Sequence, residues 1–187
     1  MIGRVVVGLS GASGAALGAS VVRQLHQMGA EVDLVISAAA TRTLQAECGE
    51  DEIARLQGLA HRQHDIANIG ATIASGSVPV QGMIVAPCSM RSLAAIANAL
   101  DDNLLTRAAG VQLKERRRLV LLTREAPLTL AHLRNMTAVT EMGAIVMPPV
   151  PAFYLNPPTL QDVVDQIAAR AIGLLGLTAP EAQEWGG

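Results

Sequence analysis

The segment Val5-Val6-Val7-Gly8-Leu9-Ser10-Gly11-Ala12-Ser13-Gly14, VVVGLSGASG, is an apolar run that passes into a loop of small residues. The apolar run predicts a buried strand, and a glycine-rich loop in this place is typical of an anion site at the start of a helix. The glycines match neither the dinucleotide pattern GxGxxG nor the P-loop pattern GxxxxGK[ST]. The segment therefore predicts a strand and an anion site without saying which anion is bound.

Further apolar runs alternate with stretches of helical period along the rest of the chain. The runs that predict strands are Arg4 to Gly8, Val32 to Ile36, Gly82 to Ala86, Leu119 to Leu122 and Ala144 to Met147. The first helix is predicted by apolar residues spaced three and four apart, at Leu17, Val21, Leu25 and Met28. Because these strands are apolar on both faces, we expect an α/β, Rossmann-like three-layer sandwich, a parallel sheet covered by helices on both faces.

Length and composition limit the function classes that the chain can serve. The 187 residues are expected to form one domain, 1–187, and only 16% of them are charged, which favours a homo-oligomer with a large subunit interface. A net charge of -2 and the lack of a long apolar run argue against nucleic acid as a partner and against a membrane span. No signal peptide is apparent and there are only two cysteines, Cys48 and Cys88, so a cytoplasmic protein with reduced thiols is expected.

Hydroxyl groups follow three of the predicted strands. Ser13 and Ser37 come after the first two, and the segment Pro87-Cys88-Ser89-Met90-Arg91-Ser92 comes after the third. Parallel sheets bind ligands at the carboxyl ends of their strands, so these groups favour a phosphorylated cofactor such as FMN. NAD is a weaker alternative, because only Asp33 could serve as its ribose-binding acid and the GxGxxG spacing is missing. Ser13 could equally be the N-cap of the first helix.

Charged and aromatic residues near the later strands supply further candidates. Arg124 and Glu125 follow the fourth strand, where an arginine can grip phosphate and a glutamate can carry a proton. We expect Glu125 to be buried and to be neutralised by Arg124 or Lys114. Tyr154 stands in a proline-rich segment of a chain with three aromatic residues, which favours a functional phenol.

Several other features favour a structural role or an ordinary loop. The pair Asp101-Asp102 is expected to cap a helix, and His26 and His132 lie in helical patterns. No spacing of His61 and His64 with the cysteines matches a metal site. The segment Ile66 to Val80, rich in glycine, serine and alanine, is expected to be a long functional loop and not part of the core.

Several motifs in this order resemble the flavin prenyltransferases. They are GLSGASG, APCSMRSLAAIANAL, RAAGVQLKERRRLVLLTREAPL, HLRNM and GAIVMPPVPAFY, and the resemblance runs from about Arg4 to Gly176. It implies that the chain joins a dimethylallyl group from dimethylallyl monophosphate to N5 and C6 of reduced FMN without a metal. The product, prenylated FMN, would pass to a separate decarboxylase. Relatives form dodecamers with active sites where subunits meet, so the tail 176–187, with Trp185, is expected to make subunit contacts.

The resemblance also implies roles for individual residues. It places three residues of the first loop on the flavin, with Ser13 near N5: Gly11, Ala12 and Ser13. It assigns the remaining flavin and phosphate contacts to Ser37, Ser89, Met90, Arg91, Ser92 and Arg124. It implies proton transfer by Glu125 and Ser13, and catalytic roles also for Lys114 and for Glu47, an acidic group beside the active site. The implied prenyl-phosphate set is Arg107, Lys114, Tyr154 and Arg170. The sequence departs from the family at Gly110, where aspartate is usual, and at Thr123, where proline is common.

Three other functions compete with this interpretation. A related flavoprotein that oxidatively decarboxylates cysteinyl substrates would use a histidine, for which His64 is the candidate, but its Asn/Met-rich substrate motif is missing. A flavin carrier or an accessory subunit without catalysis is a second alternative. A direct decarboxylase of aromatic acids is a third, although no site for a substrate carboxylate is evident.

Overall fold

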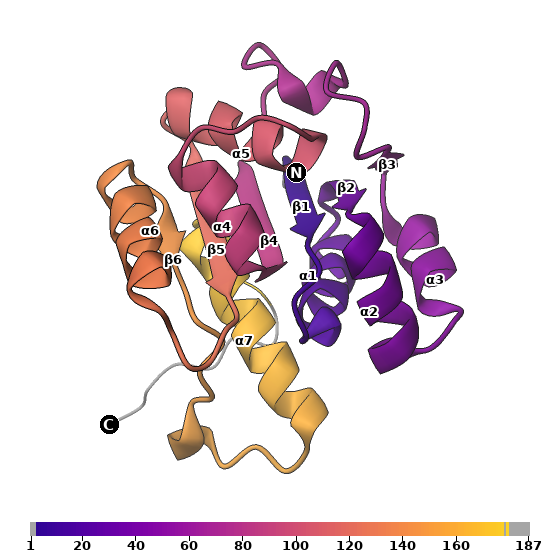
Figure 1. The fold of residues 1–187 in the computed structure, drawn as a ribbon. Coiled ribbons are helices and arrows are strands. Elements are labelled where there is room, and N and C mark those ends of the chain that lie inside the picture. The colour runs from indigo at the N-terminus through magenta and orange to yellow at the C-terminus, as the bar shows by residue number, and fades with distance from the viewer. Residues whose placement is uncertain (1–2, 178, 180–187) are drawn as a thin grey trace.

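The computed structural model describes residues 3–177 and residue 179, and a six-stranded sheet forms its centre (Figure 1). The strand order is β3-β2-β1-β4-β5-β6, and all neighbouring strands are parallel. The strands are β1 (Arg4–Leu9), β2 (Glu31–Ile36), β3 (Arg62–His64), β4 (Gly82–Cys88), β5 (Arg118–Thr123) and β6 (Ile145–Val146). The five predicted strands are confirmed. The strand β3 was not predicted, because this short edge strand, Arg-Gln-His, contains no apolar run.

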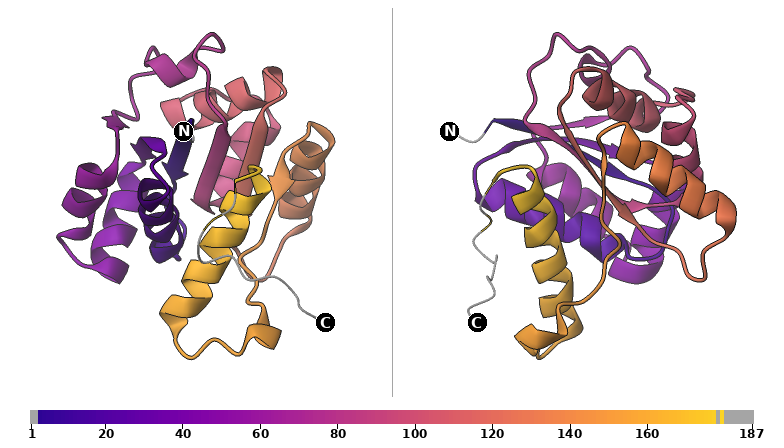
Figure 2. Two further views of the ribbon diagram at one scale, coloured as in Figure 1. Left: turned by 180° about the vertical axis from the view of Figure 1, so that it is seen from behind. Right: turned by 90° about the vertical axis from the view of Figure 1, so that its left-hand side faces the viewer.

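Helices cover both faces of the sheet (Figure 2). One face packs against α1 (Ala15–Gln27), α2 (Ala38–Cys48), α3 (Glu52–Leu59) and α7 (Leu160–Leu174). The other packs against α4 (Met90–Ala97), α5 (Leu104–Lys114), α6 (Leu130–Glu141) and the 3₁₀ turn η1 (Thr72–Ala74). Alternate residues of β1 enter opposite cores, since Val5 and Val7 face the first and Val6 the second. The three-layer α/β sandwich is confirmed.

The strand order places a topological switch point between β1 and β4, and the carboxyl edge of the sheet at this point is called the crevice from here on. The chain leaves β1 toward α1 on one face and leaves β4 toward α4 on the other face. Loops that leave in opposite directions open a gap at the carboxyl ends of the two strands, and doubly wound sheets bind their ligands at this switch point. The loop of residues 10–14 and the start of α4 flank it.

Gly18 brings α1 directly onto the strands that border this crevice. A Cβ added at Gly18 would lie 2.2 Å from the carbonyl oxygen of Ala86 and 2.7 Å from the side chain of Leu9. We expect Gly18→Ala to destabilise the fold by about 1–3 kcal/mol, because the backbone oxygen cannot move aside. Gly58→Ala, in α3 with no atom within 4 Å of the new Cβ, should be neutral or stabilising. Urea unfolding of both variants measures the difference.

The segment Ile66 to Val80 is partly core, so that part of the sequence prediction is wrong. Ala71, Ile73 and Ala74 are buried and join the core cluster that includes α5. A polar, glycine-rich composition hid these apolar side chains, which are separated in sequence by Thr72 and followed by serines. The segment is therefore anchored by η1 and not a free loop.

Some predictions extend beyond the described residues. The C-terminal segment 176–187, expected to contact other subunits, lies mostly outside the described residues, so its role and the extent of a single domain over 1–187 stay predictions. Within residues 3–177, no helix combines the length and the apolar character needed to cross a membrane.

Candidate functional site

Ser10 ties the two loops of the crevice together. Its hydroxyl donates to the carbonyl oxygen of Pro87 at 2.8 Å and accepts from the backbone N–H of Ser89 at 2.7 Å. The side chain is buried, with 2% of its surface exposed. Sequence reasoning singled out Ser13 in this loop and missed Ser10, because both serines stand beside glycine and only the packing distinguishes them.

Ser37 and Ser89 begin the helices that follow β2 and β4. The Ser37 hydroxyl accepts from the N–H of Ala40 at 3.1 Å, and the Ser89 hydroxyl accepts from the N–H of Ser92 at 3.2 Å. Both residues are therefore N-caps, and they direct the positive ends of α2 and α4 toward the carboxyl edge of the sheet. Gly11 packs against the start of α2, since a Cβ added to Gly11 would lie 2.2 Å from the Cβ of Ala39.

Glu47, and not Ser13, caps the start of α1. Its Oε2 atom accepts from the backbone N–H of Gly14 at 2.9 Å and of Ala15 at 2.8 Å. The N-cap residue Gly14 has a left-handed φ of 99° and no side chain to serve this role. The anion predicted at the start of α1 is therefore the Glu47 carboxylate of the protein itself. A phosphate from outside the protein would bind at the N-termini of α2 and α4 instead.

The environment of Glu47 also gathers Ser13 and Arg124. Partial burial raises the pKa of Glu47, but hydrogen bonds from Ala15, the Ser13 side chain and Gly14, together with the charge of Arg124, lower it overall. Ser13 and Arg124, assigned from widely separated motifs, thus both lie near the Glu47 carboxylate. A catalytic role for Glu47 stays a prediction, whereas its two hydrogen bonds to Gly14 and Ala15 hold the first loop in place.

Glu47→Ala should weaken the fold in a pH-dependent way. At pH 7 we expect a loss of about 1 kcal/mol, the usual effect of losing a helix cap. Because the pKa of Glu47 is lowered in the folded protein, its contribution is present above the unfolded value near 4.3 and disappears as the pH falls through the folded value. Urea unfolding should therefore separate wild type and variant fully at pH 7, and bring them together only at an acid pH below the lowered folded pKa of Glu47. An equal gap at both pH values would contradict this assignment, and Glu141→Ala on α6 serves as the control.

Arg124 and Glu125 follow β5 at the same edge of the sheet. The backbone N–H of Arg124 donates to the carbonyl oxygen of Cys88 at 3.1 Å, which joins the ends of β4 and β5. Glu125 is exposed, and its Oε1 accepts from the N–H of Ala126 at 3.1 Å. The expectation of a buried Glu125 neutralised by Arg124 or Lys114 is wrong, because the loop after β5 lies at the surface.

Tyr154 and Arg170 share a second site. Both line a hollow of about 160 Å³ between the segment after β6, the 3₁₀ turn η2 (Phe153–Leu155) and α7. Tyr154 is 54% exposed. The structure thus brings together the phenol and the guanidinium that were assigned to the prenyl phosphate.

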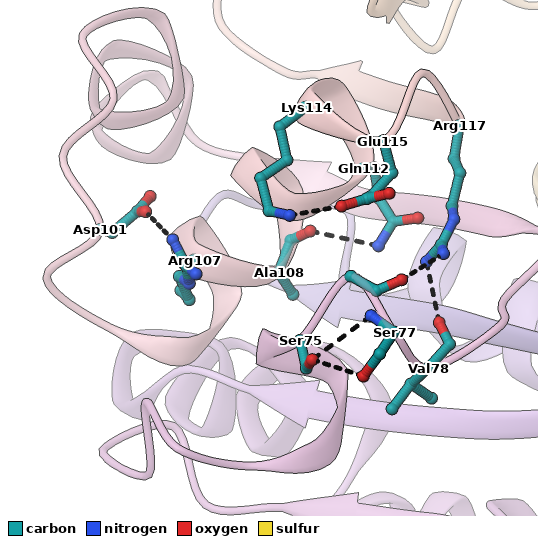
Figure 3. Close-up of polar contacts among 11 residues, drawn as sticks. Ser75, Ser77, Val78, Asp101, Arg107, Ala108, Gln112, Lys114, Glu115 and Arg117 are labelled. Atoms are coloured by element: carbon teal, nitrogen blue, oxygen red, sulfur yellow. Dashed lines mark hydrogen bonds and ion pairs between the residues drawn. The ribbon is translucent and has the colours of Figure 1, made fainter.

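Lys114 and Arg107 belong to a third site on α5. Lys114 pairs with Glu115, and Arg107 Nη1 lies 2.9 Å from Asp101 Oδ2 (Figure 3). Lys114 ends α5 just before β5 begins, whereas Arg124 directly follows the end of β5. At about 3.3 Å per residue, six-residue β5 separates these two edges by roughly 20 Å. Within one chain, the structure does not bring Lys114 together with Arg124 and Glu125.

Arg91 and the two aspartates form ion pairs with neighbours in the fold. The guanidinium of Arg91 pairs with Asp102 in the loop before α5. Asn103, not an aspartate, is the N-cap of α5 and accepts from the N–H of Thr106 at 3.1 Å. The predicted capping by Asp101-Asp102 is therefore wrong. The neighbouring Met90 starts α4 beside the crevice.

The histidines and cysteines have ordinary structural surroundings. His64 is buried, and its Nε2 lies 2.7 Å from Oδ1 of Asp33 in the middle of β2. Burial raises the pKa of the Cys88 thiol to about 12, so this thiol is not a nucleophile at neutral pH. Among the described residues, no group of three His, Cys, Asp or Glu side chains is arranged to hold a metal ion. The geometry of His64 gives no support to the cysteinyl decarboxylase alternative.

Comparison with known proteins identifies the relatives of this chain. The flavoprotein family matches residues 2–172. The flavin prenyltransferase UbiX of Neisseria meningitidis serogroup B is 50% identical over 189 residues, which covers 100% of this chain and 98% of the relative. The chain belongs to the flavin prenyltransferase family.

Solved structures of this family share the fold closely. The crystal structure of AnUbiX (PadA1) in complex with FMN and dimethylallyl pyrophosphate has a TM-score of 0.96 and 43% identity, and covers 100% of this chain and 99% of that chain. The dodecameric FMN-dependent UbiX-like decarboxylase from Escherichia coli O157:H7 has a TM-score of 0.94 and 43% identity, with coverage of 98% and 100%. The family resemblance inferred from the motifs is confirmed.

The described residues at the crevice fit a phosphorylated flavin. The Ser37 hydroxyl accepts one hydrogen bond and, among residues 3–177, donates none, so its hydrogen is available to a phosphate oxygen. The Thr123 hydroxyl at the end of β5 is buried without a partner in the same part of the chain. Two helix N-termini, Arg124 and these hydroxyls form a set of donors that suits the phosphate and the polar ring edge of FMN.

Proposed function

We propose that this chain transfers a dimethylallyl group from dimethylallyl monophosphate to N5 and C6 of reduced FMN, giving prenylated FMN. The observation that carries the proposal is the cluster of Ser13, Glu47 and Arg124 at the carboxyl edge of the sheet, in a chain that is 50% identical to a named flavin prenyltransferase. AnUbiX, with the same fold, was crystallised with FMN and dimethylallyl pyrophosphate.

The residues of the crevice hold the flavin and move protons. Reduced FMN, when bound, supplies the electron-rich N5 and C6 positions to which the five-carbon group is joined. Ser37 and the N-terminus of α2 bind its phosphate side, and Gly11, Ala12 and Ser13 contact the ring. The other side of the flavin is lined by Ser89, Met90, Arg91 and Ser92. Glu125, which is exposed and does not cap a helix, transfers protons during the reaction. Glu47 keeps Ser13 in place.

Cationic side chains stabilise the phosphate that leaves the five-carbon group. Lys114, Arg124 and Arg170 interact more strongly with the departing phosphate than with the intact ester, because negative charge develops as the C–O bond breaks. Arg107 and the phenol of Tyr154 complete the set. In this proposal these fixed charges do the work for which other prenyl-transfer sites use a divalent ion, and the reaction is metal-independent.

The complete site requires more than one subunit. Lys114 lies at the edge of the sheet opposite to Arg124 and Glu125 in the same chain, so a neighbour supplies it. Large apolar side chains are exposed around the Tyr154 hollow and on α6, including Phe153 at 77%, Leu160 at 79% and Leu130 at 60%. Large apolar side chains left this exposed indicate that a subunit interface covers them. We propose the dodecameric assembly of the Escherichia coli relative for this chain.

The proposal also includes the fate of the product and the compartment. Prenylated FMN passes to a separate decarboxylase, as the resemblance to the flavin prenyltransferases implies. Both described cysteines are free thiols, Cys88 buried and Cys48 partly buried, which supports a reducing, cytoplasmic location.

An anaerobic assay tests the function directly. The protein is incubated with reduced FMN and dimethylallyl monophosphate, and mass spectrometry should show a flavin heavier by one C5 unit. Parallel reactions with dimethylallyl diphosphate and with EDTA measure donor preference and metal dependence. A flavin of unchanged mass in every reaction would refute the prenyltransferase function and leave a flavin carrier as the function of this fold.

A further inference from the structure

Arg117 fastens the loop before β4 to the end of α5. Its Nη1 donates to the carbonyl oxygen of Val78 at 2.9 Å, and its Nη2 donates to that of Gly76 at 2.6 Å (Figure 3). Within the loop, the hydroxyls of Ser75 and Ser77 lie 2.8 Å apart. The backbone of residues 75–78 is therefore held against the residues that follow α5.

The ion pair of Lys114 and Glu115 lies directly against this loop. The hydrogen bond and the charge of Lys114, with a smaller contribution from Arg117, lower the pKa of Glu115. Glu115 is thus a carboxylate at neutral pH and keeps the Lys114 ammonium beside it. The pair stands at the surface, where Lys114 has half of its side chain exposed.

Gly76 is the point of contact between the loop and the ion pair. A Cβ at this position would lie 2.0 Å from Glu115 Oε1 and 2.7 Å from Lys114 Nζ. The φ of Gly76 is outside the left-handed region, so space and not backbone conformation requires glycine here. Both clashing atoms are the tips of flexible side chains, and a methyl group would therefore displace the ion pair without unfolding the loop.

We infer that Gly76 and Glu115 are positioning residues for Lys114. The loop of residues 75–78, braced by η1 and Arg117, limits where the ion pair can lie and so fixes the direction of the ammonium. A lysine loses much rotamer freedom when it binds a phosphate, and an ammonium that is already held in place binds at a smaller entropic cost. The inference rests on the proposed function, in which Lys114 binds the prenyl phosphate in a neighbouring subunit.

Lys114 is the only lysine in the chain, which allows a test that needs no turnover. Acetic anhydride at pH 8 labels this single side-chain amine, and mass spectrometry of the peptide that contains it gives the rate. We expect Gly76→Ala to raise the rate about threefold, the factor for losing an exposed ion pair. Gly70→Ala is the matched control, because its Cβ would meet only Asn68 Oδ1 at 3.6 Å in the same segment.

Kinetics then show whether the loop acts through Lys114. Gly76→Ala should lower kcat/KM for dimethylallyl monophosphate roughly tenfold, because a misplaced ammonium interacts less well with both the intact ester and the departing phosphate. In a Lys114→Ala background the same substitution should add nothing, because the group that it misplaces is gone. Thermal unfolding of each variant confirms that the fold is retained.

Two results would overturn the inference. One is an unchanged labelling rate in Gly76→Ala; the other is a fall in kcat/KM of equal size with and without Lys114, which would mean that the loop acts elsewhere. A wild-type protein that prenylates no flavin would refute the proposed function instead, and the labelling rates would still decide whether Gly76 positions Lys114.

Discussion

Glu125→Gln is expected to abolish prenylation while FMN stays bound. Glutamine keeps the size and the hydrogen-bonding capacity of the side chain but cannot exchange a proton at neutral pH. General acid-base groups contribute about 10²–10⁴ in rate, so kcat should fall at least a hundredfold. The other carboxylate of the crevice, Glu47, is held by two backbone N–H groups and a lowered pKa, so it is poorly suited to replace Glu125.

Single-turnover prenylation, followed by mass spectrometry of the flavin, measures this effect. Flavin fluorescence quenching should give the same FMN affinity for the variant and for wild type, because Glu125 is assigned to proton transfer and not to binding. Glu141→Gln, at the exposed end of α6, is the matched carboxylate control. Full turnover in Glu125→Gln would remove the proton-carrying role from this residue.

Lys114→Ala should be nearly inactive by itself and should regain activity when combined with Glu125→Gln subunits. Removing a charge that stabilises a developing anion costs about 10²–10³ in rate. In assemblies formed from equal amounts of the two variants, half of the crevices keep Glu125 and half of the neighbouring subunits keep Lys114. With random placement around a closed assembly, roughly one site in four therefore has both groups. Co-expressed subunits should therefore recover about a quarter of the wild-type rate.

A second combination provides the control for this experiment. Arg124→Ala and Glu125→Gln affect neighbouring residues of the same crevice, so every crevice in their mixed assembly stays defective and no activity should return. Recovery in this control, or none with Lys114→Ala, would contradict the assignment of Lys114 and Glu125 to different subunits of one site.

The sequence predicted the sheet well because its strands are apolar runs with helices between them. β1, β2, β4, β5 and β6 all carry this signal, and their ends mark the ligand edge. β3 carries none, since it is a three-residue strand of polar residues at the sheet margin, held by pairing with β2 and by the buried contact of His64 with Asp33. Such tertiary contacts leave no local pattern.

The site was less predictable because its contacts join distant residues. Nothing local to Glu47 shows that it caps a helix that begins 32 residues earlier. The motif KERRRLVLLTREAPL places Lys114 and Glu125 eleven positions apart, yet the strand between them carries them to opposite edges of the sheet. Motif resemblance assigned roles to both residues, and only the direction of β5 shows that they lie far apart within one chain.

This opposition of Lys114 and Glu125 has a consequence for the protein at low concentration. Under the proposed function, a solitary subunit could carry flavin in its crevice, yet its own Lys114 would lie too far away to complete the site. Turnover then depends on the association of subunits. Specific activity should fall on dilution before the helical signal of the protein is lost. Substitutions at the surfaces where subunits meet would abolish activity without changing any residue that contacts the substrate.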